Sequence, residues 1–221
     1  MKRASSTPAK GERRALIGFV PQYRLCAELT LAALVKGRLK WIKLLSDEAG
    51  RIDDFLIASQ GRLDAYQVKY GEQPRTYTLN ELLAPQKKKN GEKGASWLQQ
   101  LADGWRLLLT AYSNREIHVH LVLRGIGSRI GAINGIPVSL RRNSFQQFLT
   151  EGWRAAPDSP TRSKWKTIIE VIADESKLLK SDFERFRLHC HVDFLPTLES
   201  TSAFRDQLEH DHERDIEDLK A

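Results

Sequence analysis

The stretch RIDDFLIASQGRLDAYQVKY, residues 51–70, decides the fold of this chain. Its apolar residues fall into two short runs, which predict two strands joined by a turn at Gln60 and Gly61. An Asp-Asp pair lies in the first run and a Gln-x-Lys pattern in the second. Charged groups in strands that bury at least one face are costly unless partners satisfy them. We therefore expect this pair of strands to carry a functional site.

The sequence outside this stretch predicts helices interleaved with strands. Such an order is typical of an α/β domain, here with a mixed central sheet flanked by helices. The expected elements are a helix at 21–35, strands at 39–45, 52–57 and 63–68, helices at 79–84 and 97–112, a strand at 117–124, helices from 143 and at 163–173, a strand at 183–194 and a charged helix at 198–219.

The chain of 221 residues, 41% of them hydrophobic, is long enough for one sizeable core. We expect a flexible basic arm at 1–14 and a main domain at 15–195, with its core at 15–124 and a helical and strand extension at 125–195. The acidic helix within 196–221 is expected to connect to a further domain of a longer protein.

Charge is unevenly distributed along the chain. Residues 1–190 contain 32 lysines and arginines against 19 aspartates and glutamates, whereas residues 191–221 contain 3 against 9. A basic body favours an anionic partner such as nucleic acid. No apolar run approaches the roughly 18 residues of a membrane span, and the N-terminus lacks a secretory apolar stretch, so we expect a cytoplasmic protein that makes no membrane contact.

Strand alternation selects which side chains of the central stretch can meet. On the second strand Gln67 and Lys69 face one way and Asp64 faces the other. The carboxylate that joins Gln67 and Lys69 must therefore come from elsewhere, and Asp53 and Asp54 on the neighbouring strand are the nearest candidates.

The helix at 21–35 offers another carboxylate, Glu28. At 100° per residue, Glu28 falls within a stripe formed by Leu25, Leu31, Ala32 and Val35. Two interpretations stay open: an inward carboxylate that binds a cation, or a glutamate at the edge of the stripe that reaches solvent or an arginine. A carboxylate, a side-chain carbonyl and a nearby lysine suit Mg²⁺, which polarises a phosphodiester and lowers the pKa of bound water.

The pattern Asp-x(12)-Gln-x-Lys across two strands, behind a helix with a glutamate, resembles the PD-(D/E)xK nuclease motif in its Gln-x-Lys form. This form occurs in Mrr-like endonucleases and in CD-NTase-associated and other DNA endonucleases of bacterial anti-phage systems. The segment GFVPQY (18–23) resembles the Gly-Phe-x-x-Gln entry of that endonuclease group. The segments SDEAGRIDD (46–54), AYQVKY (65–70) and WLQQLADGWRLL (97–108) are similar to the N-terminal effector domains of AVAST-type STAND ATPases. The resemblance extends over residues 11–124.

The resemblance implies a restriction-endonuclease-like core and cleavage of double-stranded DNA that depends on Mg²⁺, with Mn²⁺ as a substitute. It also implies an anti-phage role and a homo-oligomer formed through an attached ATPase and sensor region. By position, the metal-binding residues would be Asp54, Gln67 and Glu28, the catalytic lysine Lys69, and the supporting residues Gln22 and Asp53.

The neutral Gln67 supports an alternative function. It removes one negative charge from the motif, so the chain is alternatively a catalytically inactive nucleic-acid-binding or scaffold module of the same fold. A lysine-rich loop at 84–95 either contacts a phosphate backbone or is simply solvated; its lysines are Lys87, Lys88, Lys89 and Lys93.

Four histidines form two His-x-His patterns, His118 with His120 and His189 with His191. Two such strands placed side by side would make a histidine metal site. Ordinary pairing of two buried strands explains the same pattern, and both interpretations stay open.

Overall fold

A computed structural model describes residues 8–52, 54–70, 74–87 and 91–195 of the chain, with side chains from residue 22 onward. The acidic segment 196–221 and residues 1–7 lie outside the described residues. None of the described helices combines the length and apolar character needed to cross a membrane.

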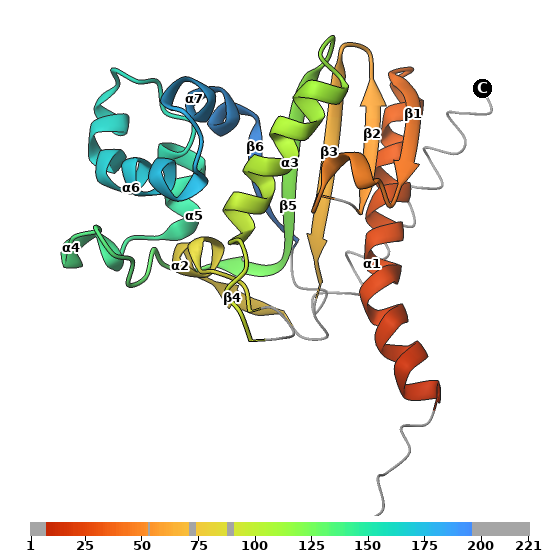
Figure 1. Cartoon of the computed structure of the whole chain (residues 1–221), viewed down its shortest axis with the longest axis horizontal. Helices are drawn as coiled ribbons and strands as arrows, with labels where there is room; N and C mark the ends of the chain where they lie inside the picture. The colour runs from red at the N-terminus through yellow and green to blue at the C-terminus, as the bar shows by residue number, and fades with distance from the viewer. Residues whose placement is uncertain (1–7, 53, 71–73, 88–90, 196–221) are drawn as a thin grey trace, which may run out of the picture.

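The centre of the structure is a mixed six-stranded sheet (Figure 1). Strands β1 (Leu39–Leu44), β2 (Phe55–Ser59) and β3 (Arg62–Lys69) form an antiparallel meander. The long strand β5 (Glu116–Gly127) pairs in parallel with β3, with β6 (Cys190–Leu195) and, at its end, with β4 (Arg75–Tyr77). The expected α/β class with a mixed sheet is confirmed.

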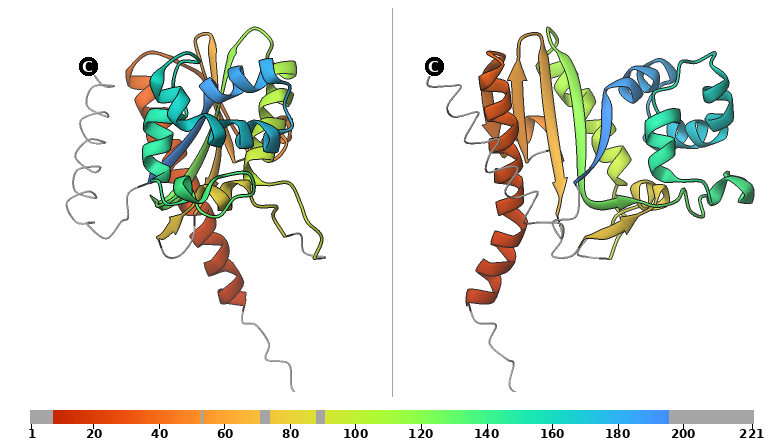
Figure 2. Two further views of the ribbon diagram at one scale, coloured as in Figure 1. Left: turned by 90° about the vertical axis from the view of Figure 1, so that its left-hand side faces the viewer. Right: turned by 180° about the vertical axis from the view of Figure 1, so that it is seen from behind.

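Helices cover the two faces of the sheet (Figure 2). Helix α1 (Pro8–Val35) lies over one face, where Leu25, Cys26 and Leu29 meet an apolar patch of β2 and β3. Helix α3 (Trp97–Ala111) lies on the other face, and its residues Leu101 and Trp105 belong to the main core. Alternation along β3 separates the two cores, because Leu63 and Ala65 face α3 while Tyr66 and Val68 face α1.

The C-terminal half of the described chain packs on the same main core. Its elements are α4 (Val138–Arg141), α5 (Phe145–Gln147), a π-helical turn (Phe148–Gly152), α6 (Pro160–Ser176) and α7 (Lys180–His189). Aromatic side chains link these elements, as when Phe148 meets Trp165 at a centroid distance of 5.4 Å. The remaining short elements are a 3₁₀ turn (Asp47–Ala49) and α2 (Leu79–Leu83), which Thr78 caps.

Three expected boundaries are wrong. Helix α1 begins at Pro8 rather than at Pro21, so residues 8–14 are helical, and Pro21 lies inside the helix, where it lacks the N–H for one backbone hydrogen bond. Residues 75–77 form strand β4 instead of a loop. The expected strand at 183–194 is helical up to His189, because Phe183 and Phe186 are buried at the three-residue spacing of a helix.

Gly125 allows β4 to approach β5. It has a φ of +141°, and a Cβ atom at this position would lie 1.8 Å from the carbonyl oxygen of Arg75. Only glycine fits this close contact between backbones.

Candidate functional site

Asp54 is the centre of a polar cluster at the end of the β2–β3 pair. Its Oδ2 atom accepts hydrogen bonds from the Val68 backbone N–H at 2.6 Å and from Gln67 Nε2 at 2.8 Å. Its Oδ1 atom accepts one from Gln22 Nε2 of α1 at 3.1 Å. The ladder between the strands ends at the Phe55–Tyr66 pair, so the Asp54 side chain satisfies the next N–H of β3.

The cluster contains three of the residues that the sequence suggested. Asp54, Gln67 and Gln22 come together from the start of β2, from β3 and from α1. Gln67 is only 6% exposed. Lys69 ends β3 two residues later and, by strand alternation, lies on the same face as Gln67.

Glu28 does not have the inward position that its helical phase suggested. It forms an ion pair with Arg24, one turn earlier on α1, at 3.0 Å and with partly exposed side chains. The buried stripe of this helix is made instead by Leu25, Cys26 and Leu29, which places Glu28 at its edge. The second interpretation from the sequence, a glutamate that reaches an arginine, is therefore the one the structure supports.

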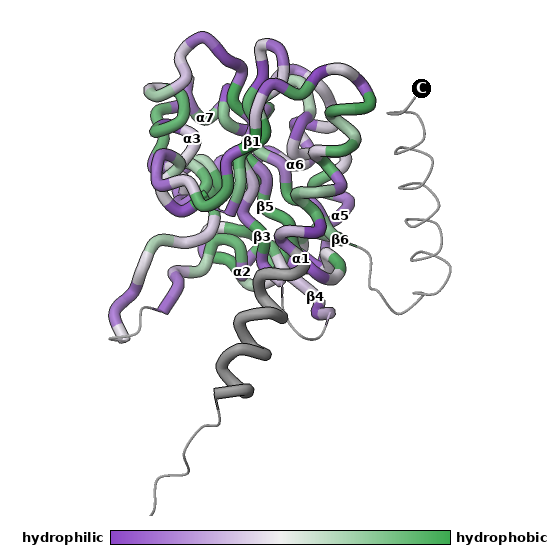
Figure 3. The backbone as a smooth tube through the Cα atoms, turned by 90° about the vertical axis from the view of Figure 1, so that its right-hand side faces the viewer, coloured by the Kyte–Doolittle hydropathy of each residue, from purple (hydrophilic) through white to green (hydrophobic). Residues whose placement is uncertain are grey.

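Several other residues from the sequence analysis are outside this cluster. Asp53, Lys88 and Lys89 lie outside the described residues. Lys87 and Lys93 face each other in an isolated antiparallel bridge at the base of their loop. Figure 3 shows this loop as a largely hydrophilic segment that projects from the body of the molecule.

A second polar cluster lies on the α1 side of the sheet, where the strand histidines gather. Phe55, Tyr66, His120 and His191 are register partners on β2, β3, β5 and β6. Their rings stack in sequence, with centroid distances of 4.6, 4.4 and 4.3 Å. The two His-x-His segments therefore do come together, although His189 ends α7 and only His191 lies in β6.

His120 lies between two carboxylates. Its Nε2 is 2.9 Å from Asp64 Oδ1 and its Nδ1 is 3.2 Å from Asp193 Oδ2. Burial lowers the pKa of His120, but these two hydrogen bonds outweigh burial and raise that pKa overall. This imidazole is satisfied on both nitrogens and is an ion-pair partner within the fold.

Asp64 is the main acceptor of this second cluster. Arg62 donates to both of its oxygens, with Nε at 2.8 Å from Oδ2 and Nη2 at 2.5 Å from Oδ1. Burial raises the pKa of Asp64, but the hydrogen bonds from His120 and Arg62 outweigh it and lower that pKa to about 2. As strand alternation predicted, Asp64 lies apart from Gln67 and Lys69.

The remaining two histidines meet Glu116 at the start of β5. Glu116 Oε1 is 2.9 Å from His189 Nε2 and 3.2 Å from His118 Nε2. Hydrogen bonding to His189 lowers the pKa of Glu116, whereas burial lowers the pKa of His118. His118 Nδ1 is 2.9 Å from His191 Nε2, and burial followed by the charges of His120 and Arg154 lowers the pKa of His191 to about 3.

The His-x-His patterns indicated the histidines of this second cluster but not their partners, which are Arg62, Asp64, Glu116 and Asp193. A signal was present, because Glu116, His118 and His120 alternate along one strand and therefore share a face. Comparison of the chain with protein-family models, with curated proteins and with solved structures gave no match in any of the three.

Proposed function

We propose that this chain is a Mg²⁺-dependent endonuclease domain that cleaves double-stranded DNA. The observation that supports it best is the convergence on Asp54 of Gln67 from β3 and Gln22 from α1. These residues are 13 and 32 positions away from Asp54 in the sequence, and the motif named them from sequence alone. The motif also lies where the resemblance expects it, with Asp54 directly before β2 and Gln67 and Lys69 in β3, behind helix α1.

The groups at Asp54 fit a hard cation. The three donors described above are amide groups that hold the carboxylate in one orientation. In this proposal Asp54 and the Gln67 side-chain carbonyl hold the ion, because oxygen ligands are those that Mg²⁺ prefers. The ion would polarise the phosphodiester and activate water, while Lys69 would stabilise developing negative charge. Glu28 has no part in this arrangement, given its pairing with Arg24.

The test is plasmid cleavage by the full chain with Mg²⁺ or Mn²⁺. Asp54→Asn and Lys69→Met are each expected to reduce the cleavage rate by about 100-fold or more, since each removes a charge that acts on the reacting phosphate. Asp103→Asn, which changes an exposed carboxylate of α3, is the matched control. Cleavage that survives at the parental rate in both site variants would contradict the proposal.

The neutral Gln67 favours a second candidate, a DNA-binding module without catalysis. Gln67→Glu distinguishes the two candidates. This variant replaces the 2.8 Å hydrogen bond from Gln67 Nε2 to Asp54 Oδ2 with two carboxylates that face and repel each other. If the site holds Mg²⁺, this variant loses thermal stability in EDTA and regains it with Mg²⁺, by mass action on the folded state. A melting temperature that does not respond to Mg²⁺ in either protein, together with salt-sensitive DNA binding and no cleavage, would favour the second candidate.

The biological setting is a further part of the proposal. The resemblance of residues 11–124 supports a role in anti-phage defence and activation by homo-oligomerisation through an attached ATPase region. The excess of basic residues over 1–190 supports a nucleic-acid partner.

A further inference from the structure

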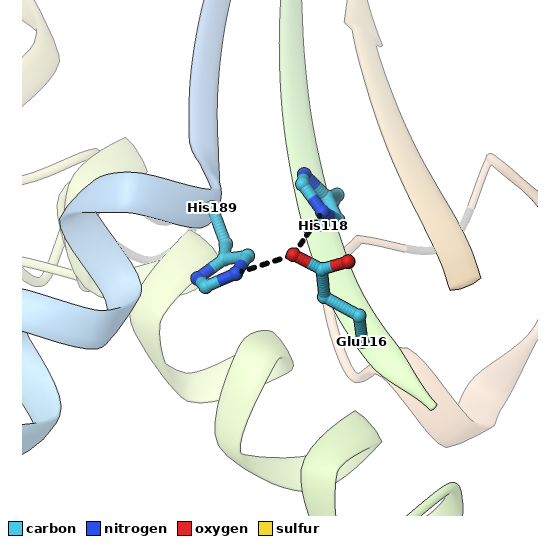
Figure 4. Close-up of side chains that lie close together, drawn as sticks. All are labelled: Glu116, His118 and His189. Atoms are coloured by element: carbon cyan, nitrogen blue, oxygen red, sulfur yellow. Dashed lines mark hydrogen bonds and ion pairs between the residues drawn. The ribbon is translucent and has the colours of Figure 1, made fainter. Parts of the chain in front are cut away.

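We propose that Glu116, His118 and His189 form a binding site for a divalent transition-metal ion such as Zn²⁺, separate from the Asp54 cluster. Figure 4 shows the three side chains directed at one another from the start of β5 and the end of α7. The four-histidine site considered from the sequence is thereby replaced by a site of two histidines and one glutamate.

The separations of the ligand atoms suit one small ion. One atom from each side chain can be chosen so that all three lie within 4.8 Å of one another. The two measured contacts to Glu116 Oε1 are 2.9 and 3.2 Å. Ligands bound at about 2.0–2.1 Å around a tetrahedral ion stand roughly 3.4 Å apart. A small change in side-chain rotation is therefore sufficient to bring an ion within bonding distance of all three.

The second nitrogen of each imidazole is already engaged. His189 Nδ1 lies 2.7 Å from the carbonyl oxygen of Arg185, to which it donates, so the lone pair of the neutral ring is on Nε2, the atom that faces Glu116. His118 Nδ1 lies 2.9 Å from His191 Nε2, and Arg154 donates to His191 Nδ1, so the neutral His191 donates from Nε2 and His118 accepts at Nδ1. The proton of His118 is therefore on Nε2, and binding of an ion there would release it. Hydrogen bonds that hold the far nitrogen orient histidine ligands in metal sites.

The Nε2 atom of His118 provides an independent observation. It is buried and makes no hydrogen bond with any described residue, although Glu116 Oε1 is only 3.2 Å away. A hydrogen bond requires the N–H to point at the oxygen, whereas two ligands of one ion point at a third position between them. A buried N–H without a hydrogen-bond acceptor is costly, and a bound ion that replaces this proton would remove that cost.

The donor set selects the class of ion. Two imidazoles and one carboxylate suit Zn²⁺ and its neighbours among the transition metals, whereas Mg²⁺ prefers oxygen ligands only. Three protein ligands leave a fourth position for water, and the 56% exposed side chain of Glu116 gives solvent access to it.

The site is also distant from Asp54. In the parallel β3–β5 register Gln67 lies beside Leu121, five residues along the strand from Glu116, which corresponds to roughly 16 Å. Loss of one site therefore leaves the other in place, and the two proposals can fail separately.

The test is titration of the metal-free full chain with Zn²⁺ alone, followed by calorimetry and metal analysis. The parent for this experiment is His210→Asn/His212→Asn, which removes the two histidines of the segment 196–221. We expect one Zn²⁺ per chain in this parent, and Co²⁺ in its place should give the visible absorption of a four-coordinate site. Loss of a residue that only hydrogen-bonds to a metal ligand weakens metal binding by up to roughly 100-fold. Glu116→Gln and His189→Asn each remove a ligand itself, so each is expected to weaken Zn²⁺ binding by more than that.

The matched control is Glu151→Gln, which changes an exposed carboxylate on another element and should bind Zn²⁺ as the parent does. Both site variants change partly exposed side chains, so circular dichroism should report an unchanged fold. A parent that binds no stoichiometric Zn²⁺, or site variants with parental affinity, would overturn the proposal.

Discussion

Asp54 and Asp64 are ten positions apart and differ in the donors that hold them. Asp54 accepts hydrogen bonds from the amide groups of Gln22 and Gln67, and Asp64 accepts them from the guanidinium of Arg62 and from His120. Charged donors compensate the negative charge of a carboxylate and stabilise it within the fold, whereas neutral donors mainly fix its orientation. The charged donors of Asp64 assign this carboxylate to the stability of the fold.

Asp64→Asn is expected to lower the free energy of unfolding by about 2 kcal/mol at pH 7, since the depressed pKa of Asp64 measures its extra stabilisation in the folded state. A carboxyl with a lowered pKa stabilises the fold above its unfolded pKa and loses this effect as pH falls through the folded value. The difference between the parent and the variant should therefore shrink between pH 4 and pH 2. Urea denaturation across this range measures it.

The exposed Asp103→Asn is the control for that series and should stay within about 0.5 kcal/mol of the parent. A difference between the parent and Asp64→Asn that stays constant as the pH falls would show that Asp64 does not act through its charge.

At the residue scale, strand alternation was a better guide than helical phase. A strand has only two faces, so Gln67 and Asp64 had to lie on opposite sides, and the carboxylate partner of Gln67 had to come from another element. The helix around Glu28 is apolar on several sides, as the segment LCAELTLAALV shows. Its buried stripe is therefore set by the sheet against which it packs, and this partner could not be read from the helix alone.

At the element scale, the position of α3 depends on close contact with the turn that leads into β2. Gly104 faces this turn, and a Cβ atom there would lie 2.5 Å from Ile52 Cδ1 and 2.6 Å from the carbonyl oxygen of Ala49. Both neighbours are fully buried, so neither can move away at low cost. The glycine thus sets the distance between the helix and the segment that carries Asp54.

Gly104→Ala is expected to destabilise the protein by about 1–3 kcal/mol, because overpacking against a backbone oxygen outweighs the better helix propensity of alanine. Thermal and urea unfolding measure the loss. Ile52→Val removes the methyl group on the other side of the contact, so it should cost less in the Gly104→Ala background than alone. A stabilised Gly104→Ala variant would mean that the helix stands further from the turn.

Elements with a strong local pattern could be predicted, and those set by distant partners could not. Helix α3 has its apolar residues at three- and four-residue spacing, and its expected range was confirmed to within one residue. The segment around Arg187 also alternates as a strand would, yet Arg187 is buried in α7 against Glu184 and the backbone carbonyls of Trp153 and Ala155. The two carbonyl groups lie just after a separate π-helical turn, about 30 residues earlier in the chain, which the local pattern does not reveal.

At the scale of the whole molecule, β3 and β5 connect two polar clusters of different chemistry. The Asp54 cluster, with amide and carboxylate oxygens, lies toward the C-terminal ends of these parallel strands. The cluster of Glu116, His118 and His189 lies toward their N-terminal ends. The apolar residues between them pack into both cores, so the sheet is a rigid spacer between the two clusters.

The two clusters are therefore expected to bind their ions independently. Asp54→Asn should abolish the response of the melting temperature to Mg²⁺ and leave Zn²⁺ affinity unchanged, and His189→Asn should do the reverse. In the double variant the loss of Mg²⁺ binding free energy should equal that of Asp54→Asn alone, and the loss of Zn²⁺ binding free energy should equal that of His189→Asn alone, each to within about 0.5 kcal/mol. The reason is that sites more than 7–10 Å apart without shared partners seldom couple. Calorimetric titration of the four proteins with each ion gives the cycle. A change in Zn²⁺ affinity in Asp54→Asn would instead mean that the strands between the clusters shift on binding, and that the sheet transmits this shift from one cluster to the other.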